Sequence, residues 1–438
     1  MAQQTLVQGR AQPNVRHMND HTAHDAPLWD VLLRPQGQEQ INQRNVVIDA
    51  VGVGITAGVG SFLSVFLVRL GASSFLIGLL TAMPALTGML LAMPVGEFLA
   101  RRPNVVPWFA RSRFWVLSSY VLTGLVPFIF KSNQPEIIIL IWALATVPQT
   151  VVSVAFTVVM GGVAGPRGRL TLMSRRWSTL GLTNSLTVVI VGQLLNLFNF
   201  PLNYQIVFIG SAIGAFISVV FSSSLKLPPQ QITQAPPKQG GVFGSLRERG
   251  RDVARRRPFL NFIIAQFVFR WGLTLAMPLL PIYWVKQVGA SDPQISAINS
   301  AGTFVAMIAY FVWTKVSGKR GPRFVLLLAA FGTSFYPLLT ALTRTPLLLP
   351  LWAGMHGFFF AGVDLVFFEM VLATSPAENQ ASYIGFYHTT VYVATFVAPL
   401  IGSALVDAIG LIPLLVIATL LRLTGTGLML WLGVGRQE

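Results

Sequence analysis

Long apolar stretches alternate with short polar segments along most of this chain. Each stretch holds about twenty or more mainly apolar residues, enough for a helix rising 1.5 Å per residue to cross a hydrocarbon layer about 30 Å thick. The pattern predicts about twelve membrane-spanning helices, at 46–70, 75–99, 105–129, 136–163, 177–198, 204–225, 259–285, 293–314, 324–343, 346–374, 382–406 and 411–434. The expected fold class is therefore an all-α polytopic membrane protein.

The composition agrees with a protein that lies in a membrane. Hydrophobic residues make up 53% of the 438 residues and charged residues 11%, which is less than half the charged share of soluble domains. The formal net charge is +16, but the basic residues lie between apolar stretches, without zinc-finger spacing or an aromatic platform, so we expect no nucleic-acid partner. The chain has no cysteine, which excludes thiolate metal sites and cysteine nucleophiles.

The basic residues also predict the orientation of the spans. If the N-terminus is cytoplasmic, the outer loops and span ends hold Arg69, Lys131, Lys286 and Arg344, whereas most of the 31 Lys and Arg residues fall in inner segments. Lys and Arg are enriched on the cytoplasmic side of membrane proteins, and a shift by one span would destroy the alternation. We therefore expect an even number of spans with both termini cytoplasmic. The inner loop 375–381, which has no Lys or Arg, is the exception.

Polar segments divide the spans into two groups of six. Residues 1–45 are a polar, cytoplasmic N-terminal tail that lacks the apolar core of a secretory signal peptide and carries one interfacial turn at Leu28–Leu33. Residues 226–258 are a cytoplasmic linker, rich in proline at its start and basic at its end, which either sets the topology or binds anionic headgroups as a short helix. The expected divisions are an N-terminal bundle at 46–225, a C-terminal bundle at 259–434 and a cytoplasmic C-terminus at 435–438.

The two groups of spans resemble each other in sequence. With an offset of 218 residues the Gly-Ala-Ser at 71–73 matches the Gly-Ala-Ser at 289–291, and Arg102 falls on Arg320. With an offset of 210 residues Trp142 falls on Trp352, and further identities continue along the next span and its loop. A constant offset across several positions indicates an internal duplication, which is typical of secondary transporters with a central binding site.

The loop after the eighth span reads WTKVSGKRGPR, and its counterpart in the first half is GEFLARRPN. Both resemble the loop motif of the major facilitator superfamily, in which an acid precedes basic residues and a glycine to form a charge clamp at a helix end. Here Gly318 and Ala100 stand where that family usually has Asp, and Glu97, one helical turn earlier, is the candidate to replace the acid. The resemblance implies gating roles for the motif residues Glu97, Arg101, Arg102, Lys319, Arg320, Gly321 and Arg323.

The resemblance covers residues 46–434 and implies two pseudo-symmetric six-helix bundles with spans 1, 4, 7 and 10 around a central cavity. Two family signatures are missing. The fourth span lacks the buried Arg of many proton antiporters, and the fifth lacks their Gly-Pro motif. These absences argue against a standard drug/proton antiporter without excluding efflux.

Arg270 and Asp364 are the charged residues expected deepest in spans 7 and 10. Arg270 lies about 16 Å from the inner start of its span and Asp364 about 15 Å from the inner end of its own. Charges inside a bilayer are costly unless they are paired. We therefore expect the two residues to pair, either as a couple opened by substrate or by protonation, or as a structural ion pair that holds the two spans in register.

Other ionisable residues in the spans have a functional and a structural interpretation each. His356 is either a proton relay or a satisfied packing residue. Glu369, nearer the inner surface, is a gating candidate. Asp49 is either a coupling acid or a helix-start residue that faces the headgroups, and the second is favoured. For Arg422, in the last span, snorkelling or pairing with a neighbouring span is expected rather than a substrate contact.

Uncharged residues complete the candidate substrate site: Gln149 in the fourth span and Gln266 and Trp271 beside Arg270. Phenylalanines crowd the tenth span, at 358–360, so the cavity is more apolar than that of a sugar carrier. This favours an amphiphilic or hydrophobic solute, although helix packing alone also explains the phenylalanines.

The resulting hypothesis is a secondary transporter that moves a small solute by alternating access, with protons as the candidate coupling ion. The alternative is an assembly, scaffold or sensor protein on the same fold that transports nothing. No Walker-type loop, metal-spaced cluster or catalytic constellation is present in the sequence, so we expect neither an enzyme nor a bound cofactor or metal. The partners expected are a small-molecule solute and membrane lipid, and the location expected is the bacterial inner membrane.

Overall fold

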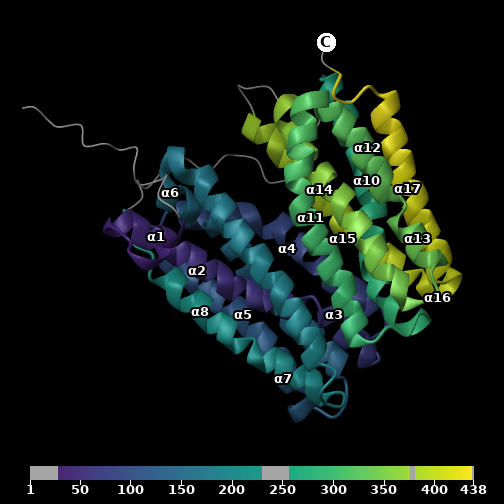
Figure 1. Cartoon of the computed structure of the whole chain (residues 1–438), viewed down its shortest axis with the longest axis horizontal. Helices are drawn as coiled ribbons and strands as arrows, with labels where there is room; N and C mark the ends of the chain where they lie inside the picture. The colour runs from purple at the N-terminus through teal and green to yellow at the C-terminus, as the bar shows by residue number, and fades with distance from the viewer. Residues whose placement is uncertain (1–27, 229–255, 375–379, 437–438) are drawn as a thin grey trace, which may run out of the picture.

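The computed structural model of this chain describes residues 28–228, 256–374 and 380–436. Within these ranges every regular element is a helix, and the helices form two bundles that splay apart toward one end (Figure 1). The N-terminal bundle contains α1 (Leu28–Leu33), α2 (Gly37–Gly60), α3 (Leu63–Arg69), α4 (Ser74–Ala100), α5 (Val106–Ile129), α6 (Gln134–Leu194), α7 (Leu202–Gly210) and α8 (Ala212–Ser223).

The C-terminal bundle begins with α10 (Arg257–Ile282), which continues into the π-helical turn η1 (Tyr283–Gln287). Its other elements are α11 (Asp292–Arg320), α12 (Pro322–Ser334), α13 (Tyr336–Leu342), the 3-10 turn η2 (Pro346–Leu348), α14 (Leu349–Thr374), α15 (Gln380–Ala404), α16 (Val406–Ile409) and α17 (Leu411–Trp431). The predicted all-α membrane fold is confirmed, and the interfacial turn expected at Leu28–Leu33 is the helix α1. Residues 229–255 of the predicted linker lie outside the described residues, and Arg257, near its predicted end, is the first residue of α10.

Eleven stretches of described residues are long and apolar enough to cross a membrane. The predicted fifth span is not among them, because serine, threonine and asparagine interrupt it. It is instead the last part of α6, a 61-residue helix that would be about 92 Å long if straight. The Cζ of Arg176 lies only 4.6 Å from the ring centroid of Phe156, twenty residues earlier. The helix therefore folds back on itself and provides two antiparallel crossings.

Small residues allow close packing within the N-terminal bundle. A Cβ built on Gly54 would lie 2.7 Å from the Cβ of Thr183, and one built on Gly58 would lie 2.6 Å from the Cβ of Thr187. The small-xxx-small spacing of α2 therefore brings the polar return stretch of α6 against its backbone. This packing explains how a span of modest hydropathy is held in the bundle.

The internal repeat is visible in the structure. Gly71 and Gly289 both have positive φ, +87° and +66°, where glycine adopts a backbone conformation that other residues rarely take. Two residues later Ser73 and Ser291 are the N-caps of α4 and α11. The repeated Gly-Ala-Ser is thus a turn and a cap that start equivalent helices in the two halves.

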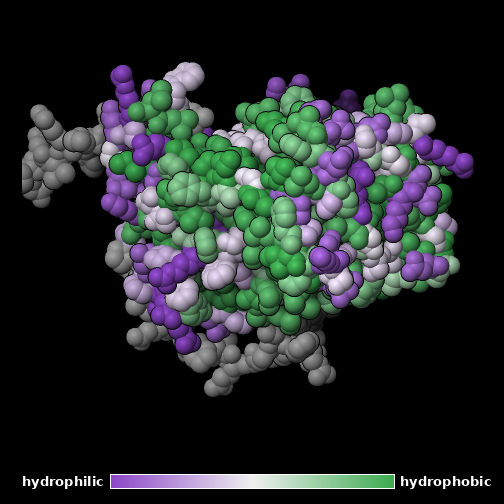
Figure 2. Space-filling model, turned by 90° about the horizontal axis from the view of Figure 1, so that it is seen from below, coloured by the Kyte–Doolittle hydropathy of each residue, from purple (hydrophilic) through white to green (hydrophobic). Residues whose placement is uncertain are grey.

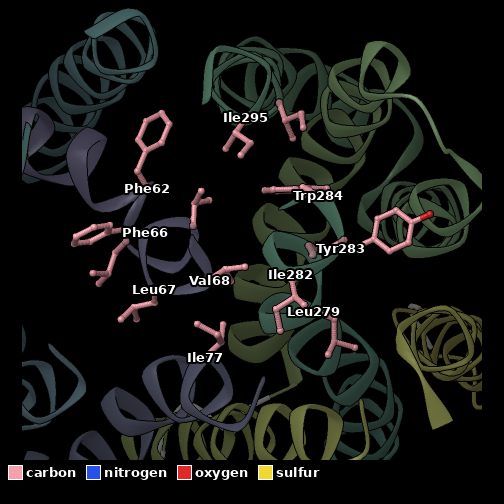
Figure 3. Packing of buried hydrophobic residues seen from close by; sticks show 14 of the residues in the cluster. Phe62, Phe66, Leu67, Val68, Ile77, Leu279, Ile282, Tyr283, Trp284 and Ile295 are labelled. Atoms are coloured by element: carbon pink, nitrogen blue, oxygen red, sulfur yellow. The ribbon is translucent and has the colours of Figure 1, made fainter. Parts of the chain in front are cut away.

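The hydrophobic cores show how the two halves meet. One cluster joins α3, with Phe66 and Leu67, to α10, with Leu279 and Ile282, and Figure 3 shows side chains of this cluster from both elements. A second cluster contains residues of the C-terminal half alone, and a third contains residues of the N-terminal half alone. The halves therefore share a core at the end where α3 and η1 lie, which we call the closed end. Toward the opposite end, which we call the open end, each half has its own core.

Two helix pairs line the seam between the halves: α4 packs along α15, and α6 packs along α11. Both α4 and α11 start at the closed end and finish at the open end, where the bundles diverge in Figure 1. The face shown in Figure 2 is mainly hydrophobic in its middle, and hydrophilic residues gather toward its left and right edges. A broad apolar surface of this kind is suited to lipid.

Candidate functional site

The first crossing of α6 is exposed on two opposite faces. Leu140, Leu144 and Val147 form an apolar exposed face, with exposed fractions of 60%, 67% and 46%. Gln149 is also exposed, on the opposite side of the helix, and Ser153 follows it at the next turn. An apolar exposed face is suited to lipid, whereas exposed polar residues at membrane depth are expected to face protein or water. Gln149 and Ser153 are thus exposed polar residues of this crossing.

Arg270 lies half-buried on α10, facing α15. Its Nη2 donates to the Tyr387 hydroxyl at 3.3 Å, and its Cζ lies 5.7 Å from the ring centroid of Phe367. Its Nε is enclosed without a hydrogen-bond partner in the described structure. The exposed His388, next to Tyr387, is within electrostatic range of the guanidinium.

The expected ion pair between Arg270 and Asp364 is not formed. Asp364 is exposed on α14, and its Oδ2 accepts a hydrogen bond from the Tyr310 hydroxyl of α11 at 2.9 Å. The depth estimate from helical rise does not give the direction of a side chain around its helix, and here one residue turns to α15 and the other to α11. Tyr387 lies within electrostatic range of both charges.

Gln266 and Trp271 flank Arg270 along α10, and neither has all its polar atoms satisfied. The Nε2 of Gln266 donates to the Thr390 hydroxyl at 3.0 Å, while its Oε1 is enclosed without a partner in the described part of the chain. The indole Nε1 of Trp271 is likewise without one. Because Gln266 and Arg270 both bond α15, polar groups are concentrated along the α10–α15 contact.

His356 lies away from this contact, where α14 packs against α12 and α13. Its Nδ1 is 2.6 Å from the Thr333 hydroxyl, and its ring stacks on Tyr336 with centroids 4.5 Å apart. Arg422 is next to this group and is 1% exposed, so it does not snorkel. Its guanidinium donates to the carbonyls of Gly272, Thr333 and Leu273, at 3.2, 3.1 and 3.4 Å.

The Thr333 carbonyl has a specific reason to accept from Arg422. In a regular helix it would accept from the N–H four residues later, but residue 337 is a proline and has no N–H. The arginine of the last span therefore satisfies a backbone group freed between α12 and α13. Arg422 and His356 together hold the C-terminal bundle rather than line the opening.

Asp49 is neither at a helix start nor on the surface of the bundle. α2 begins at Gly37, nine residues before the predicted span, so that Asp49 lies a dozen residues inside it and is 2% exposed. Its carboxylate pairs with Arg113 of α5, pairs with Arg176 of α6 at 3.3 Å, and accepts from the Ser218 hydroxyl of α8 at 2.7 Å. One acid thus joins four helices.

Arg113 and Arg176 fall in inner segments by sequence, yet they are 5% and 3% exposed. Each also lies on an aromatic ring: the Cζ of Arg113 is 4.4 Å from the Phe109 centroid, and that of Arg176 is near Phe156. The cluster holds two cations and one anion, so it retains a positive charge inside the bundle. Burial of this kind is tolerated because every charge is paired.

The gating candidates lie at the open end. Glu97, Arg101 and Arg102 are exposed at the end of α4, and in the described residues Glu97 forms no ion pair with either arginine. The guanidinium of Arg102 lies instead over the rings of Phe98 and Trp108, at 4.5 and 5.3 Å. In this conformation the acid that was expected to replace the missing Asp takes no part in a clamp.

The second copy of the motif has a similar arrangement. Lys319 and Arg320 are exposed at the end of α11, and the Cζ of Arg320 lies 4.9 Å from the Phe324 centroid. Gly321 ends the helix with φ +82°. Arg323 packs beside the backbone of the C-terminal segment at Gly435, and Glu369 is exposed on α14. The equivalent Arg102 and Arg320 therefore both stack on aromatic rings.

A polar contact at the closed end has no counterpart among the sequence-based candidates. Arg69, the last residue of α3, pairs with Asp292, the first residue of α11, at 2.8 Å, and also donates to the Ala290 carbonyl at 3.2 Å. The Tyr204 hydroxyl of α7 donates to the same carboxylate oxygen at 2.7 Å. Charges at span ends read as loop residues in a sequence, which concealed a bridge between residues 223 positions apart.

The fold matches solved transporters over nearly the whole chain. A crystal structure of a mutant of the nucleoside transporter NupG superposes with a TM-score of 0.71 at 11% identity, over 90% of this chain and 99% of that one. A bacterial homolog of the human lysosomal transporter Spinster, inward-facing and occupied, gives 0.64 at 11% identity, over 90% and 96%. The family model described as Major Facilitator Superfamily matches residues 262–437.

The C-terminal half of this chain is thus similar in sequence to the major facilitator superfamily. Curated relatives include the staphyloferrin B transporter of Staphylococcus aureus (strain NCTC 8325 / PS 47), 31% identical over 164 residues, which are 36% of this chain and 39% of that protein. The multidrug resistance protein MdtG of Proteus mirabilis (strain HI4320) is 28% identical over 151 residues, 32% of this chain and 36% of that protein. The matches therefore span less than half the length of these relatives.

The predicted multi-pass membrane protein is confirmed, and the predicted family resemblance is confirmed for residues 262–437. The likeness to the solved structures, at 11% identity, shows the fold alone.

Proposed function

We propose that this protein is a secondary transporter that moves an amphiphilic organic solute across a membrane by alternating access. The observation that carries the proposal is the arrangement of the cores. One cluster, with Phe66 and Leu279, joins the halves at the closed end, while each half has its own cluster toward the open end. Two rigid bundles hinged in this way can open one side and close the other in turn.

The open end faces the cytoplasm in this proposal. Arg101 and Arg102 directly follow α4 there, and Lys319 and Arg320 end α11. Arg69 lies at the other end. Because basic residues are enriched on the cytoplasmic side, both termini are cytoplasmic in this proposal and the conformation is the inward-open one. The proposed membrane is the bacterial inner membrane, in keeping with the bacterial relatives. The bundles that move are those expected at 46–225 and 259–434.

The solute contacts both walls of the opening. Arg270, with Trp271 beside it, offers a charge and an aromatic surface on α10, and Gln149 offers an amide on α6. Asp364 is an exposed carboxylate on α14, so it is the acid that a proton-coupled cycle would use, whereas Asp49 and His356 are enclosed by structural partners. The mixture of apolar and charged groups suits an amphiphile.

Alternating access can be tested without knowing the solute, because the chain has no cysteine. Spin labels at Lys131→Cys and Arg344→Cys report on the closed end, and labels at Ala100→Cys and Gly318→Cys report on the open end. All four positions are exposed. In lipid bilayers we expect two populations of molecules. One has a short Lys131–Arg344 distance and a long Ala100–Gly318 distance, and the other has the reverse.

A shift between these populations completes the test. Asp292→Ala weakens the closed end and should increase the population with the long Lys131–Arg344 distance and the short Ala100–Gly318 distance. If both distances keep a single value in wild type and variant alike, the bundles do not rock. A static protein of this kind would favour the assembly or scaffold alternative.

A further inference from the structure

Arg270 differs from the other arginines held inside the bundles in how its charge is satisfied. Its Nη2 donates to the Tyr387 hydroxyl at 3.3 Å, its Nε is enclosed without a partner, and its Nη1 makes no hydrogen bond to the described residues. The remaining contact is the ring of Phe367, 5.7 Å from Cζ. A neutral hydroxyl and an aromatic face leave most of the five N–H donors free.

An enclosed Nε without a partner also occurs at Arg44 and Arg176, so the comparison concerns the acceptors of the other guanidinium nitrogens in the fully buried arginines. Arg113 and Arg176 share the carboxylate of Asp49. Arg422, which has no carboxylate partner in the described structure, donates to three backbone carbonyls. Arg270 has neither arrangement. Since a charge at membrane depth is costly when it is unpaired, the structure leaves a place for a compensating anion.

The neighbours of Arg270 agree with a ligand rather than with a missing internal partner. Gln266, one turn earlier on the same face of α10, is fully buried and has an enclosed Oε1 without a partner. Trp271 has an enclosed indole N–H without one. The exposed His388 adds a second basic group on α15. Enclosed polar atoms are normally paired, so these two atoms, together with the Nε of Arg270 itself, point to an absent group.

We propose that Arg270 and Tyr387 form the head-group site for an anionic substrate, a carboxylate or a phosphate carried on an aromatic or apolar body. The guanidinium binds the anion in two-point fashion, and Trp271, Phe267 and Phe367 contact the body. Asp364, which lies within electrostatic range of Tyr387 but bonds Tyr310, disfavours a second negative charge nearby. The inference rests on the proposed transport function and names its substrate class.

One ring system with different head groups tests the proposal. We would measure thermal unfolding of the full chain in lipid nanodiscs with millimolar 2-naphthoate, 2-naphthyl phosphate, 2-naphthylmethylamine or 2-naphthol. A ligand of the native state raises the unfolding temperature by mass action. We expect the two anions, or one of them, to do so, and the amine and the alcohol to have no comparable effect. The stronger of the two anions identifies the head group as carboxylate or phosphate.

Variants connect the binding to the site. Arg270→Gln removes a charge-assisted hydrogen bond and should weaken anion binding about ten- to hundredfold. Arg270→Lys keeps the charge and should retain part of the binding, and Asp364→Asn should strengthen it. Arg344→Gln removes a cation at the exposed closed end and should change nothing. Unfolding without ligand shows whether each variant is folded.

The proposal is overturned if neither anion stabilises the wild type, if the amine or the alcohol does so equally, or if folded Arg270→Gln keeps the full response. None of these outcomes affects the label distances that test alternating access, so the failure of the substrate class and the failure of the transport mechanism can be told apart.

Discussion

Arg69 and Asp292 form an ion pair that joins the two halves of the molecule at the closed end, with 2.8 Å between Nη2 and Oδ1. Their side chains are 27% and 11% exposed, so the Coulomb attraction is partly screened. The hydroxyl of Tyr204 donates to the same carboxylate. The ring of Tyr204 stacks on the ring of Phe66, with 4.8 Å between the two ring centroids. The bridge therefore connects α3, α7 and α11.

Removing this carboxylate should loosen the closed end. Asp292→Ala takes away the ion pair and a hydrogen bond to a charged group, which together amount to about 1 to 3 kcal/mol. We expect the population of molecules in which the closed end has opened to rise about five- to hundredfold relative to wild type. Label distances at Lys131 and Arg344 measure the change. Asp407→Asn, which alters an exposed acid of α16, should leave the distances unchanged.

Glycines at the seam should have a similar effect by a steric route. A Cβ on Gly78 of α4 would collide with Ser403 of α15, and one on Gly192 of α6 would collide with Ser296 of α11. Overpacking costs about 1 to 3 kcal/mol, so Gly78→Ala and Gly192→Ala should disfavour the closed contact. Gly181→Ala is the matched control on the same helix α6, because a Cβ there meets nothing within 4 Å.

The outcome for these glycine variants is read from the same labels. An opened Lys131–Arg344 distance in Gly78→Ala and Gly192→Ala, with Gly181→Ala like wild type, would show that the seam carries the conformational equilibrium. A general loss of stability in the two variants without any change in distance would contradict this explanation.

Much of the fold could be predicted because its determinants are local in the sequence. Hydropathy gives the spans, and the repeated Gly-Ala-Ser of 71–73 and 289–291 marks equivalent turns. Helix ends were less predictable: α2 starts at Gly37 because Asn42, which hydrophobicity alone excludes from a span, bonds the Lys226 carbonyl at 2.7 Å. A polar start of a helix is thus supported by a partner 184 residues away.

The candidate site was less predictable for a geometric reason. Helical rise places Arg270 and Asp364 at similar depth. Their partners, however, depend on how α10 and α14 are rotated about their own axes in the bundle, and a single sequence does not give that rotation. Arg113 likewise reads as a loop residue, because it lies near the start of its span, although its long side chain reaches Asp49 inside the bundle. Depth can be estimated from one helix alone, whereas contacts require several.

The duplication makes a prediction about stability in the two halves. The indole N–H of Trp142 donates to the Thr123 hydroxyl at 3.0 Å, and the equivalent Trp352 donates to the Thr343 hydroxyl at 3.0 Å. Thr123→Val and Thr343→Val each leave a half-buried indole N–H without an acceptor, at about 1 to 3 kcal/mol. We expect similar decreases in thermal stability.

A control variant distinguishes the effect of an indole N–H without an acceptor from the effect of losing any threonine hydroxyl. Among the described residues the hydroxyl of Thr395 bonds only a carbonyl of its own helix, so Thr395→Val should have a much smaller effect. If one threonine of the pair matters and the other does not, the two halves are not energetically equivalent, whatever their geometry.

Asp49 offers the largest expected effect on stability. It is the acid that Arg113 and Arg176 share, and all three side chains are nearly or fully enclosed. Asp49→Asn leaves two buried cations with no counterion, and breaking a buried pair from one side costs about 3 to 5 kcal/mol. We expect a large drop in the unfolding temperature. Glu39→Gln, in the exposed first turn of the same helix, should cost less than about 1 kcal/mol.

A double variant shows whether the loss comes from unpaired charge. If it does, Asp49→Asn combined with Arg113→Gln should be more stable than Asp49→Asn alone, because one of the two uncompensated cations is gone. If the double variant is instead less stable by the sum of the single effects, the three side chains act by packing and hydrogen bonds rather than by charge. The cluster would then be a structural joint of α2, α5, α6 and α8 whose net charge has no energetic role.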